Sequence, residues 1–298
     1  MKILQYGTSG QVGRELARRA PARGIELTAL SRAEADLADP DACARHVRAA
    51  RPDLVILAGA YTAVDQAESE PGLANEINGE APAAIAAACA AEGAVLVHFS
   101  TDYVFDGRKG GPYVETDATN PLNVYGASKL SGERMALAAS PRTLVLRTSW
   151  VVSAHGKNFV KTMLRLGREG QPLRVVDDQF GRPTSAADLA DFVLGQASRL
   201  VAAKAGDPAF GLFHFANAGE TTWRGFAQGS LELALGAAAP RVDPIATADR
   251  PSPAQRPMRG TLDTGKLEQI FGYALRPWRD AVGEIVAELA QTAETPVA

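Results

Sequence analysis

Cysteine is scarce in this chain: Cys43 and Cys89 are the only two thiols among 298 residues. Two isolated cysteines in a chain of this length do not build a disulfide framework, so we expect a protein of the reducing cytoplasm. No stretch approaches the roughly 20 consecutive apolar residues that span a bilayer. The first residues also differ from a signal peptide, so the sequence gives no reason to expect a membrane location.

Charge of one sign is not concentrated either. Lys and Arg total 31, Asp and Glu total 34, and the formal net charge is -3. The basic residues are scattered, which argues against nucleic acid as the main partner. The histidines lie far apart without the spacing of metal ligands, so we expect no metal site. They are His46, His98, His155 and His214.

Short apolar runs alternate with helical patterns through the first half of the chain. The pattern predicts strands at 2–6, 26–30, 54–57, 94–99 and 143–147, and helices at 11–19, 40–50, 75–92 and 123–139. Strands that alternate with helices over short connections indicate βαβ units, and unbroken apolar runs are typical of parallel strands buried on both faces. We therefore predict an α/β fold with a Rossmann-type, doubly wound parallel sheet.

Beyond Trp150 the alternation of predicted strands and helices is less regular. Helices are predicted at 158–167, 186–200 and 278–289, with a strand-like apolar run at 173–176. The sequence has no internal repeat and no linker long enough to separate a second domain. We expect residues 1–150 to form a dinucleotide-binding domain, which the chain rejoins near residues 185–215. Residues 151–298 are expected to form mainly a smaller, substrate-binding lobe that packs on the sheet across a cleft.

Three glycines follow the first predicted strand with the spacing G-x-x-G-x-x-G: Gly7, Gly10 and Gly13. Glycine permits a tight turn and a close approach to a pyrophosphate, whose charge meets the N–H groups that open the next helix. Such a turn also occurs without a ligand, but its place in a βαβ unit favours a dinucleotide. We predict that these glycines, with Gln11 and Val12, hold the coenzyme.

The second predicted strand ends at Ser31-Arg32, without the acidic residue usual in sites specific for NAD. Arg32 suits a 2′-phosphate, so we expect NADPH as the coenzyme, with NADH possible; the alternative is that Arg32 is only solvated. Asp36 and Leu37 are expected near the adenine, and Ala58-Gly59-Ala60 would let the coenzyme pass close to the third strand. Simple loop and packing roles remain open for these residues.

Tyr125 and Lys129 are four residues apart in a predicted helix, so the phenol and the ammonium share one face. A nearby cation is expected to lower the pKa of the tyrosine and make it a usable acid at neutral pH. Such a pair also arises by chance, but this one follows a strand that ends at Ser100-Thr101-Asp102. Thr101 lies where α/β sheets bind ligands, so its hydroxyl is expected to share a substrate oxygen with Tyr125. A turn-capping role for Thr101 is the alternative.

Longer motifs extend over nearly the whole chain. They are YTAVDQAE at 61–68, STDYVFDG at 100–107, PLNVYG at 121–126, RTSW at 147–150, NF at 158–159 and DQFGRPT at 178–184. On these residues the chain resembles the extended branch of the short-chain dehydrogenase/reductase superfamily and, within it, the dTDP-4-dehydrorhamnose reductase family. STDYVFDG and DQFGRPT are the strings most particular to that family, whereas the glycine motif is generic.

The resemblance implies reduction of dTDP-4-dehydro-β-L-rhamnose to dTDP-β-L-rhamnose by NADPH or NADH. It implies that Thr101, Tyr125 and Lys129 form the catalytic set, with Tyr125 as proton donor and with Tyr125 and Lys129 also on the nicotinamide side of the coenzyme. The substrate residues that it implies are Thr101, Asp102, Tyr103, Trp150, Asn158, Gln179, Arg182 and Arg256. The family's usual Asn-Ser after the late Arg-Pro is replaced here by Met258-Arg259, which makes Arg256 the weakest match. We expect a monomer or a homodimer.

Two other functions remain open at this point. A redox-inert regulatory protein of the same fold typically loses the Tyr or the Lys, and both are present here. A dehydratase or epimerase of the same branch is the second alternative. Dehydratases need an added carboxylate beside the threonine, but Asp102 is followed by Tyr103 rather than by the Glu usual there. A reductase is therefore the predicted function.

Overall fold

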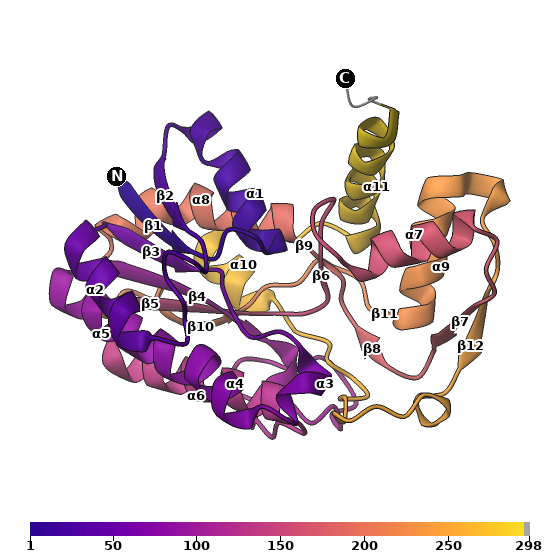
Figure 1. Ribbon diagram of the computed structural model, residues 1–298, viewed down its shortest axis with the longest axis horizontal. Helices are drawn as coiled ribbons and strands as arrows, with labels where there is room; N and C mark the ends of the chain where they lie inside the picture. The colour runs from indigo at the N-terminus through magenta and orange to yellow at the C-terminus, as the bar shows by residue number, and fades with distance from the viewer. Residues whose placement is uncertain (295–298) are drawn as a thin grey trace.

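A six-stranded parallel sheet forms the centre of the larger lobe in the computed structural model, which describes residues 1–294, with side chains as far as Gln291 (Figure 1). The strands lie in the order β10-β5-β4-β3-β1-β2. Their bounds are β1 Lys2–Tyr6, β2 Glu26–Leu30, β3 Leu54–Leu57, β4 Val95–Thr101, β5 Thr143–Thr148 and β10 Gly211–His214. The chain runs from β1 out to β2 and then crosses to β3 on the other side. This reversal is the place at which open α/β sheets bind ligands, and the predicted fold class is confirmed.

Helices cover both faces of this sheet (Figure 1). One face carries α1 Gln11–Arg19, α8 Ala186–Ala202 and α10 Gly265–Phe271, and the other carries α2 Pro40–Ala50, α5 Ala81–Glu92 and α6 Val124–Ala139. Leu54 and Ile56 of β3 pack into the first core, whereas Val55 and Leu57 pack into the second. Successive strand side chains point to opposite faces, so a strand between two cores is apolar throughout.

The helix predicted at 75–92 is divided into three parts. These are α4 Pro71–Asn75, a π-helical turn at Glu76–Glu80, and α5. The π turn carries Asn78, whose side chain accepts from the N–H of Tyr61 at 2.9 Å and donates to its carbonyl at 3.0 Å. The turn thus fixes the loop that follows β3 to the helix layer, a contact that no sequence period reveals.

The smaller lobe is built around three helices and three short strand pairs (Figure 1). The helices are α7 Phe159–Arg168, α9 Trp223–Leu235 and α11 Trp278–Glu294. The strand pairs are β6 Val151–Val152 with β9 Thr184–Ser185, β7 Leu173–Val176 with β12 Val242–Ile245, and β8 Phe180–Gly181 with β11 Thr221–Thr222. Apolar side chains from α7, α9, α11, β7 and β12 form one shared core. The lobe therefore holds together by its own packing.

Short helical segments complete the described chain: α3 Val64–Ala67 and turns at Pro21–Arg23, Asp102–Val104, Gly236–Ala238 and Thr247–Asp249. Across residues 1–294 we find no helix with the length and apolar character that a bilayer crossing requires. Cys43 and Cys89 are both free and buried, in the core beneath α2 and α5. Burial raises the pKa of the Cys43 thiol to about 11 and that of the Cys89 thiol to about 12.

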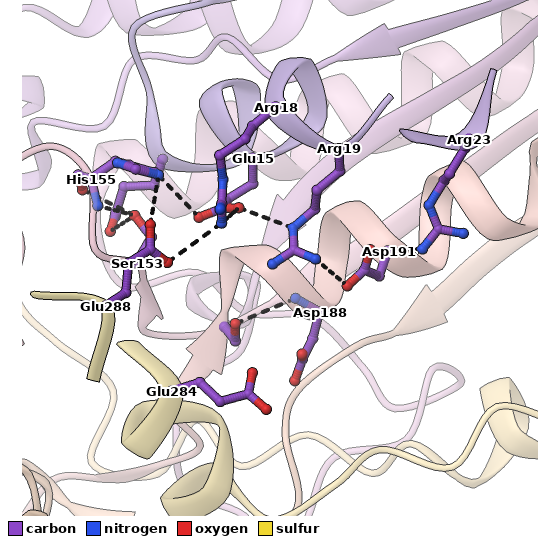
Figure 2. Close-up of polar contacts among 12 residues, drawn as sticks. Glu15, Arg18, Arg19, Arg23, Ser153, His155, Asp188, Asp191, Glu284 and Glu288 are labelled. Carbon is purple, nitrogen blue, oxygen red and sulfur yellow. Dashed lines mark hydrogen bonds and ion pairs between the residues drawn. The ribbon is translucent and has the colours of Figure 1, made fainter. Parts of the chain in front are cut away.

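Polar contacts join the two lobes where α11 lies near α1 (Figure 2). Glu15 of α1 pairs with Arg19 at 3.0 Å, and Arg19 also reaches Asp191 of α8 at 2.7 Å. His155, from the loop before α7, lies 3.5 Å from Glu15 and 3.6 Å from Glu288 of α11. Helix α1, which begins at the glycine motif, is therefore in contact with both lobes.

Candidate active site

The glycine motif forms a tight turn between β1 and α1. Gly7 has φ +88°, and a Cβ there would lie 2.6 Å from the backbone nitrogen of Gly59. A Cβ on Gly13 would lie 2.1 Å from the carbonyl oxygen of Gly7. A Cβ on Gly10, in contrast, would meet nothing within 4 Å. Two of the glycines are thus required by close backbone packing, whereas Gly10 faces open space.

The start of α1 is arranged to receive an anion. Gly10 is its N-cap, so no side chain caps the helix, and the first turn holds no acidic residue. Gln5 donates from Nε2 to the carbonyl oxygens of Gly7 at 2.8 Å and Gly13 at 3.0 Å, which fixes the turn from inside. The uncapped N–H groups of a helix start attract phosphate, and the residues present therefore fit a dinucleotide.

Other predicted coenzyme residues gather at the same edge of the sheet. Leu37 packs closely on Gly59. A Cβ on Gly59 would lie 2.9 Å from Cδ1 of Leu37. Arg32, just beyond β2, is 78% exposed, and its Nε lies 3.4 Å from Asp36. Ala58 donates its N–H to the carbonyl of Tyr6 at 2.9 Å. The carboxyl ends of β1, β2 and β3 thus bring the three predicted coenzyme segments together.

The predicted catalytic side chains come from β4 and α6. Asn123 caps α6 by accepting from the N–H of Gly126 at 2.7 Å, which places Tyr125 in the first turn. A Cβ on Gly126 would lie 2.2 Å from the Tyr103 carbonyl, so α6 packs tightly against the segment after β4. The rings of Tyr103 and Tyr125 meet edge to face at 5.7 Å. The Thr101 hydroxyl at the end of β4 lies close enough to the Tyr125 phenol to lower its pKa.

The ionisation of this set differs from the expectation drawn from the sequence. Burial raises the pKa of Tyr125 to about 12, and the nearby Thr101 hydroxyl only partly opposes this shift. Lys129 is buried and donates from Nζ to the carbonyl of Phe99 at 2.7 Å, and burial lowers its pKa to about 8. The prediction that Lys129 lowers the pKa of Tyr125 is wrong for this structure, because burial outweighs any attraction. The phenol therefore stays protonated at neutral pH, as a proton donor must.

Asp102 is buried beside Thr101. It accepts from the threonine hydroxyl at 3.1 Å, and burial raises the pKa of its carboxyl group to about 7. A Cβ on Gly260 would lie 2.2 Å from the other carboxylate oxygen. Gly260 is therefore required where the late loop of the smaller lobe covers Asp102.

A cavity of about 780 Å³ opens between the lobes, and Thr101, Tyr125 and Lys129 are not among the residues that line it. Its polar and aromatic lining includes Asp65, Phe159, Gln179, Trp223, Thr247, Arg250 and Arg256. Arg256 contacts Asp65 at 2.9 Å and lies near Tyr103, which helps to raise its pKa, so it connects the cavity wall to the tyrosine pair. Three arginines in the lining, Arg108, Arg250 and Arg256, suit an anionic ligand.

Aromatic side chains form one side of the site. Trp150 has φ +47°, a left-handed conformation that costs a non-glycine residue about 1–3 kcal/mol. Its indole stacks on Trp223 with ring centroids 3.8 Å apart, and Phe159 packs on Trp223 at 4.7 Å. A Cβ on Gly181 would lie 2.6 Å from Cε2 of Trp150. Glycine at this position therefore lets the tryptophan lie flat on β8.

The remaining predicted substrate residues differ in position. Gln179 is buried and lines the cavity, where it donates to Thr247 at 3.0 Å. Arg182 is not part of the lining; its guanidinium is partly buried, and its Nε has no hydrogen-bond acceptor in the described part of the chain. Burial lowers its pKa. Asn158 caps α7 and bonds to Gln11 at 3.0 Å, so its amide is engaged within the protein.

Several lining residues were missed by the sequence analysis, among them Trp223, Thr247 and Arg250. They come from segments 60 to 100 positions beyond Trp150 in the loosely patterned half of the chain. Their only local signal is that Trp223 follows Thr222, which caps α9 by accepting from the Gly225 N–H at 3.0 Å. That signal predicts a helix start but no ligand.

Comparison with known proteins extends this description. Residues 1–291 match the family described as RmlD substrate binding domain. The chain is 47% identical to the dTDP-4-dehydrorhamnose reductase of Burkholderia thailandensis, over 97% of this chain and 99% of that protein. It is 43% identical to the enzyme of the same name from Escherichia coli K12, over 98% and 99%.

Solved structures agree with the sequence matches. The dTDP-4-dehydrorhamnose reductase of Clostridium acetobutylicum superposes with a TM-score of 0.90 at 36% identity, covering 97% of this chain and all of that chain. The Bacillus anthracis protein of the same name, solved in complex with NADP, gives a TM-score of 0.88 at 31% identity over 96% and 99%.

Proposed function

This chain belongs to the dTDP-4-dehydrorhamnose reductase family, and we propose on that premise that it reduces dTDP-4-dehydro-β-L-rhamnose to dTDP-β-L-rhamnose with NADPH. One observation carries the proposal. The Tyr125 phenol lies beside the Thr101 hydroxyl at the carboxyl end of β4, with Lys129 one helical turn away and an arginine-lined cavity between the lobes. A carbonyl reductase needs this combination of acid, cation and cleft.

NADPH supplies the hydride when it is bound. The uncapped start of α1 at Gly10 would hold its diphosphate, and the open space there supports this assignment. Arg32 would bind the 2′-phosphate, since it is exposed at the end of β2. Leu37 and Gly59 would border the adenine side, where β1, β2 and β3 end.

The proton of the reaction comes from Tyr125. As the C4 carbonyl carbon gains a hydride, its oxygen becomes an alkoxide, which is a much stronger base than a phenolate. The pKa of Tyr125, about 12, keeps the proton on the phenol until this alkoxide forms. Thr101 would turn its hydroxyl proton from Asp102 to donate a second hydrogen bond to the same oxygen, and the Lys129 ammonium would hold the nicotinamide ribose and stabilise the phenolate left behind.

The nucleotide-sugar would occupy the cavity between the lobes. Trp150 and Trp223 offer a flat aromatic surface for a sugar or a base, and Gln179 offers an amide. Arg256 lies beside Tyr103 and would meet the diphosphate, with Arg182 as a second cation. Asp102, buried beside Thr101, would bond to a sugar hydroxyl.

We further propose that the protein acts in the cytoplasm as a monomer or a homodimer. Its two free, buried thiols suit a reducing compartment. Light scattering on the purified chain would distinguish one copy from two, and a trimer or larger assembly would contradict this part of the proposal.

The test of function is a direct assay of reduction. Purified protein is mixed with dTDP-4-dehydro-L-rhamnose and NADPH, and the loss of reduced nicotinamide absorbance is followed alongside product formation by mass spectrometry. We expect stoichiometric conversion of sugar and coenzyme. No consumption of NADPH by a folded protein that binds NADPH and dTDP would overturn the proposal.

A further inference from the structure

The side chain of Gln11 leaves the glycine turn and enters the smaller lobe. Gln11 is the first residue of α1, directly after Gly10. Its Nε2 donates to the carbonyl of Val151 at 2.9 Å, and its Oε1 accepts from Asn158 Nδ2 at 3.0 Å and from Ser153 Oγ at 3.3 Å. Every hydrogen bond found for this amide thus goes to residues at least 140 positions away in the chain.

The partners of Gln11 adjoin aromatic residues at the cavity: Val151 follows Trp150, which stacks on the lining residue Trp223, and Asn158 precedes the lining residue Phe159. Val151 opens β6 immediately after Trp150, whose carbonyl accepts from the N–H of Thr184 in β9 at 3.1 Å. Asn158 caps α7 by accepting from the Lys161 N–H at 3.0 Å, and the next residue lines the cavity. Gln11 therefore links the turn at Gly10 to Trp150 through Val151 and to Phe159 through Asn158.

A second set of contacts supports the same junction from outside (Figure 2). Ser153 accepts from the His155 N–H at 3.0 Å, and His155 lies between Glu15 and Glu288 at 3.5 and 3.6 Å. The loop before α7 is thus held on the same helix that Gln11 opens. Polar contacts therefore join the start of α1 to residues 151–158.

From this arrangement we propose that Gln11 and Asn158 are positioning residues that couple the coenzyme site to the nucleotide-sugar site. The inference rests on the proposed function, since it takes Gly10 and the start of α1 as the diphosphate site of the coenzyme. Coenzyme bound there fixes the backbone of Gln11, whose amide then holds Trp150 and α7 in the arrangement that receives the nucleotide-sugar. Each ligand therefore tightens the binding of the other, by the same factor in both directions.

The experiment measures this factor by calorimetry. dTDP is titrated into the full chain with and without saturating NADP⁺, and NADP⁺ is titrated with and without dTDP. In the unmodified protein we expect each ligand to improve the affinity for the other by about fivefold or more, the usual lower end for coupled sites. In Gln11→Leu and in Asn158→Ser we expect the improvement to shrink to less than about twofold.

The variants are chosen to separate coupling from folding. Serine is a good N-cap, so Asn158→Ser keeps the cap of α7 but is too short to reach Gln11. Gln171→Leu makes the same chemical change at an exposed position and should keep the full coupling. A purely structural role would lower the melting temperature or weaken both ligands without changing the ratio of affinities.

Three results would decide against the inference. An unchanged coupling factor in both Gln11→Leu and Asn158→Ser would overturn it, as would independent binding of the two ligands to the unmodified protein. Both of these results leave the proposed function standing, because dTDP and NADP⁺ still bind. If the folded, unmodified protein binds neither ligand, the proposed function fails and this inference fails with it.

Discussion

The indole of Trp150 lies on the indole of Trp223, with ring centroids 3.8 Å apart and ring planes 17° apart. Trp150 reaches this position with a left-handed backbone, two residues after the sheet strand β5 ends at Thr148. Strain of this kind persists only where surrounding contacts fix it, and it is common at ligand sites. The stack brings together two residues 73 positions apart in the chain.

Gly181 gives the first test of this tryptophan stack. In Gly181→Ala the added Cβ would lie 2.6 Å from Trp150, so the indole must move off Trp223. We expect the KM for the nucleotide-sugar to rise about tenfold or more, equivalent to roughly 1.4 kcal/mol, with NADPH affinity unchanged. Steady-state kinetics measures this. Gly72→Ala, where a Cβ meets nothing within 4 Å, is the control, and equal KM values in the two variants would contradict the prediction.

Tyr125→Phe removes the proposed proton donor without removing its ring. We expect kcat to fall by roughly two to four orders of magnitude, the usual range for a positioned acid, while NADPH still binds. Single-turnover kinetics and coenzyme fluorescence measure the two effects. Tyr273→Phe, at a tyrosine that packs on Phe192 and Phe215, should keep normal turnover. Near-normal kcat in a folded Tyr125→Phe protein would remove Tyr125 from the mechanism.

Arg32→Asp tests the coenzyme preference. The side chain is exposed and touches only Asp36 among the contacts found for it, so its loss should not disturb the fold. We expect the KM for NADPH to rise at least about tenfold, because a carboxylate replaces the partner of the 2′-phosphate, and the KM for NADH to change little. Arg45→Asp, on the exposed side of α2, makes the same change of net charge as a control. If both coenzymes respond alike, Arg32 does not contact the 2′-phosphate.

Arg182→Ala tests the second proposed cation of the substrate site. Its partly buried guanidinium has an unpaired Nε, so a phosphate oxygen would satisfy it. We expect the variant to bind dTDP more weakly by about 1–3 kcal/mol, as for a lost charge-assisted hydrogen bond, with NADPH binding unchanged. Calorimetry with dTDP measures the loss, and exposed Arg168→Ala serves as the control. Unchanged affinity would leave the diphosphate to Arg256.

Asp102 predicts a pH dependence of stability. Its pKa in the folded protein, about 7, is above the value of roughly 3.9 for an unfolded chain. Between these values the folded state keeps a proton that the unfolded state releases, so this group's contribution to stability decreases as the pH rises. In Asp102→Asn the dependence is absent. Relative to the unmodified protein, we expect the variant to gain roughly 1.4 kcal/mol of unfolding free energy per pH unit across this window.

Urea unfolding at several pH values in this window measures the difference. Asp106→Asn is the matched control, because the Arg108 backbone N–H holds the pKa of Asp106 below its usual range. From about pH 5 upward that carboxylate is ionised in both states, so its variant should show a constant difference there. A constant difference for Asp102→Asn as well would mean that Asp102 is ionised in the folded protein.

Much of the architecture followed from local pattern. The buried strands are predictable because a strand between two helix layers must be apolar on both sides, as in Leu54–Leu57. The convergence of Gly7, Gly59 and Thr101 at one edge follows from the parallel order of the strands. The family predicted from the motifs is confirmed by the full-length match and by relatives 42–47% identical.

The rest depends on contacts that sequence spacing does not carry. Trp223 and Thr247 reach the cavity only because the smaller lobe folds back, and neither has a motif of its own. The high pKa of Tyr125 results from its burial, which the spacing to Lys129 did not reveal. Asn158 was expected to contact substrate, yet its amide is engaged by Gln11.

Burial of Cys43 and Cys89 also makes the chain a convenient background for spectroscopic labels. With their pKa values raised to about 11 and about 12, both thiols are almost entirely protonated and covered at neutral pH, so maleimides should leave them unmodified. A cysteine introduced at exposed Lys204 in the larger lobe and another at Leu233 on α9 would then be the only labelled sites. Dyes at that pair would report the separation of the lobes as each ligand is added.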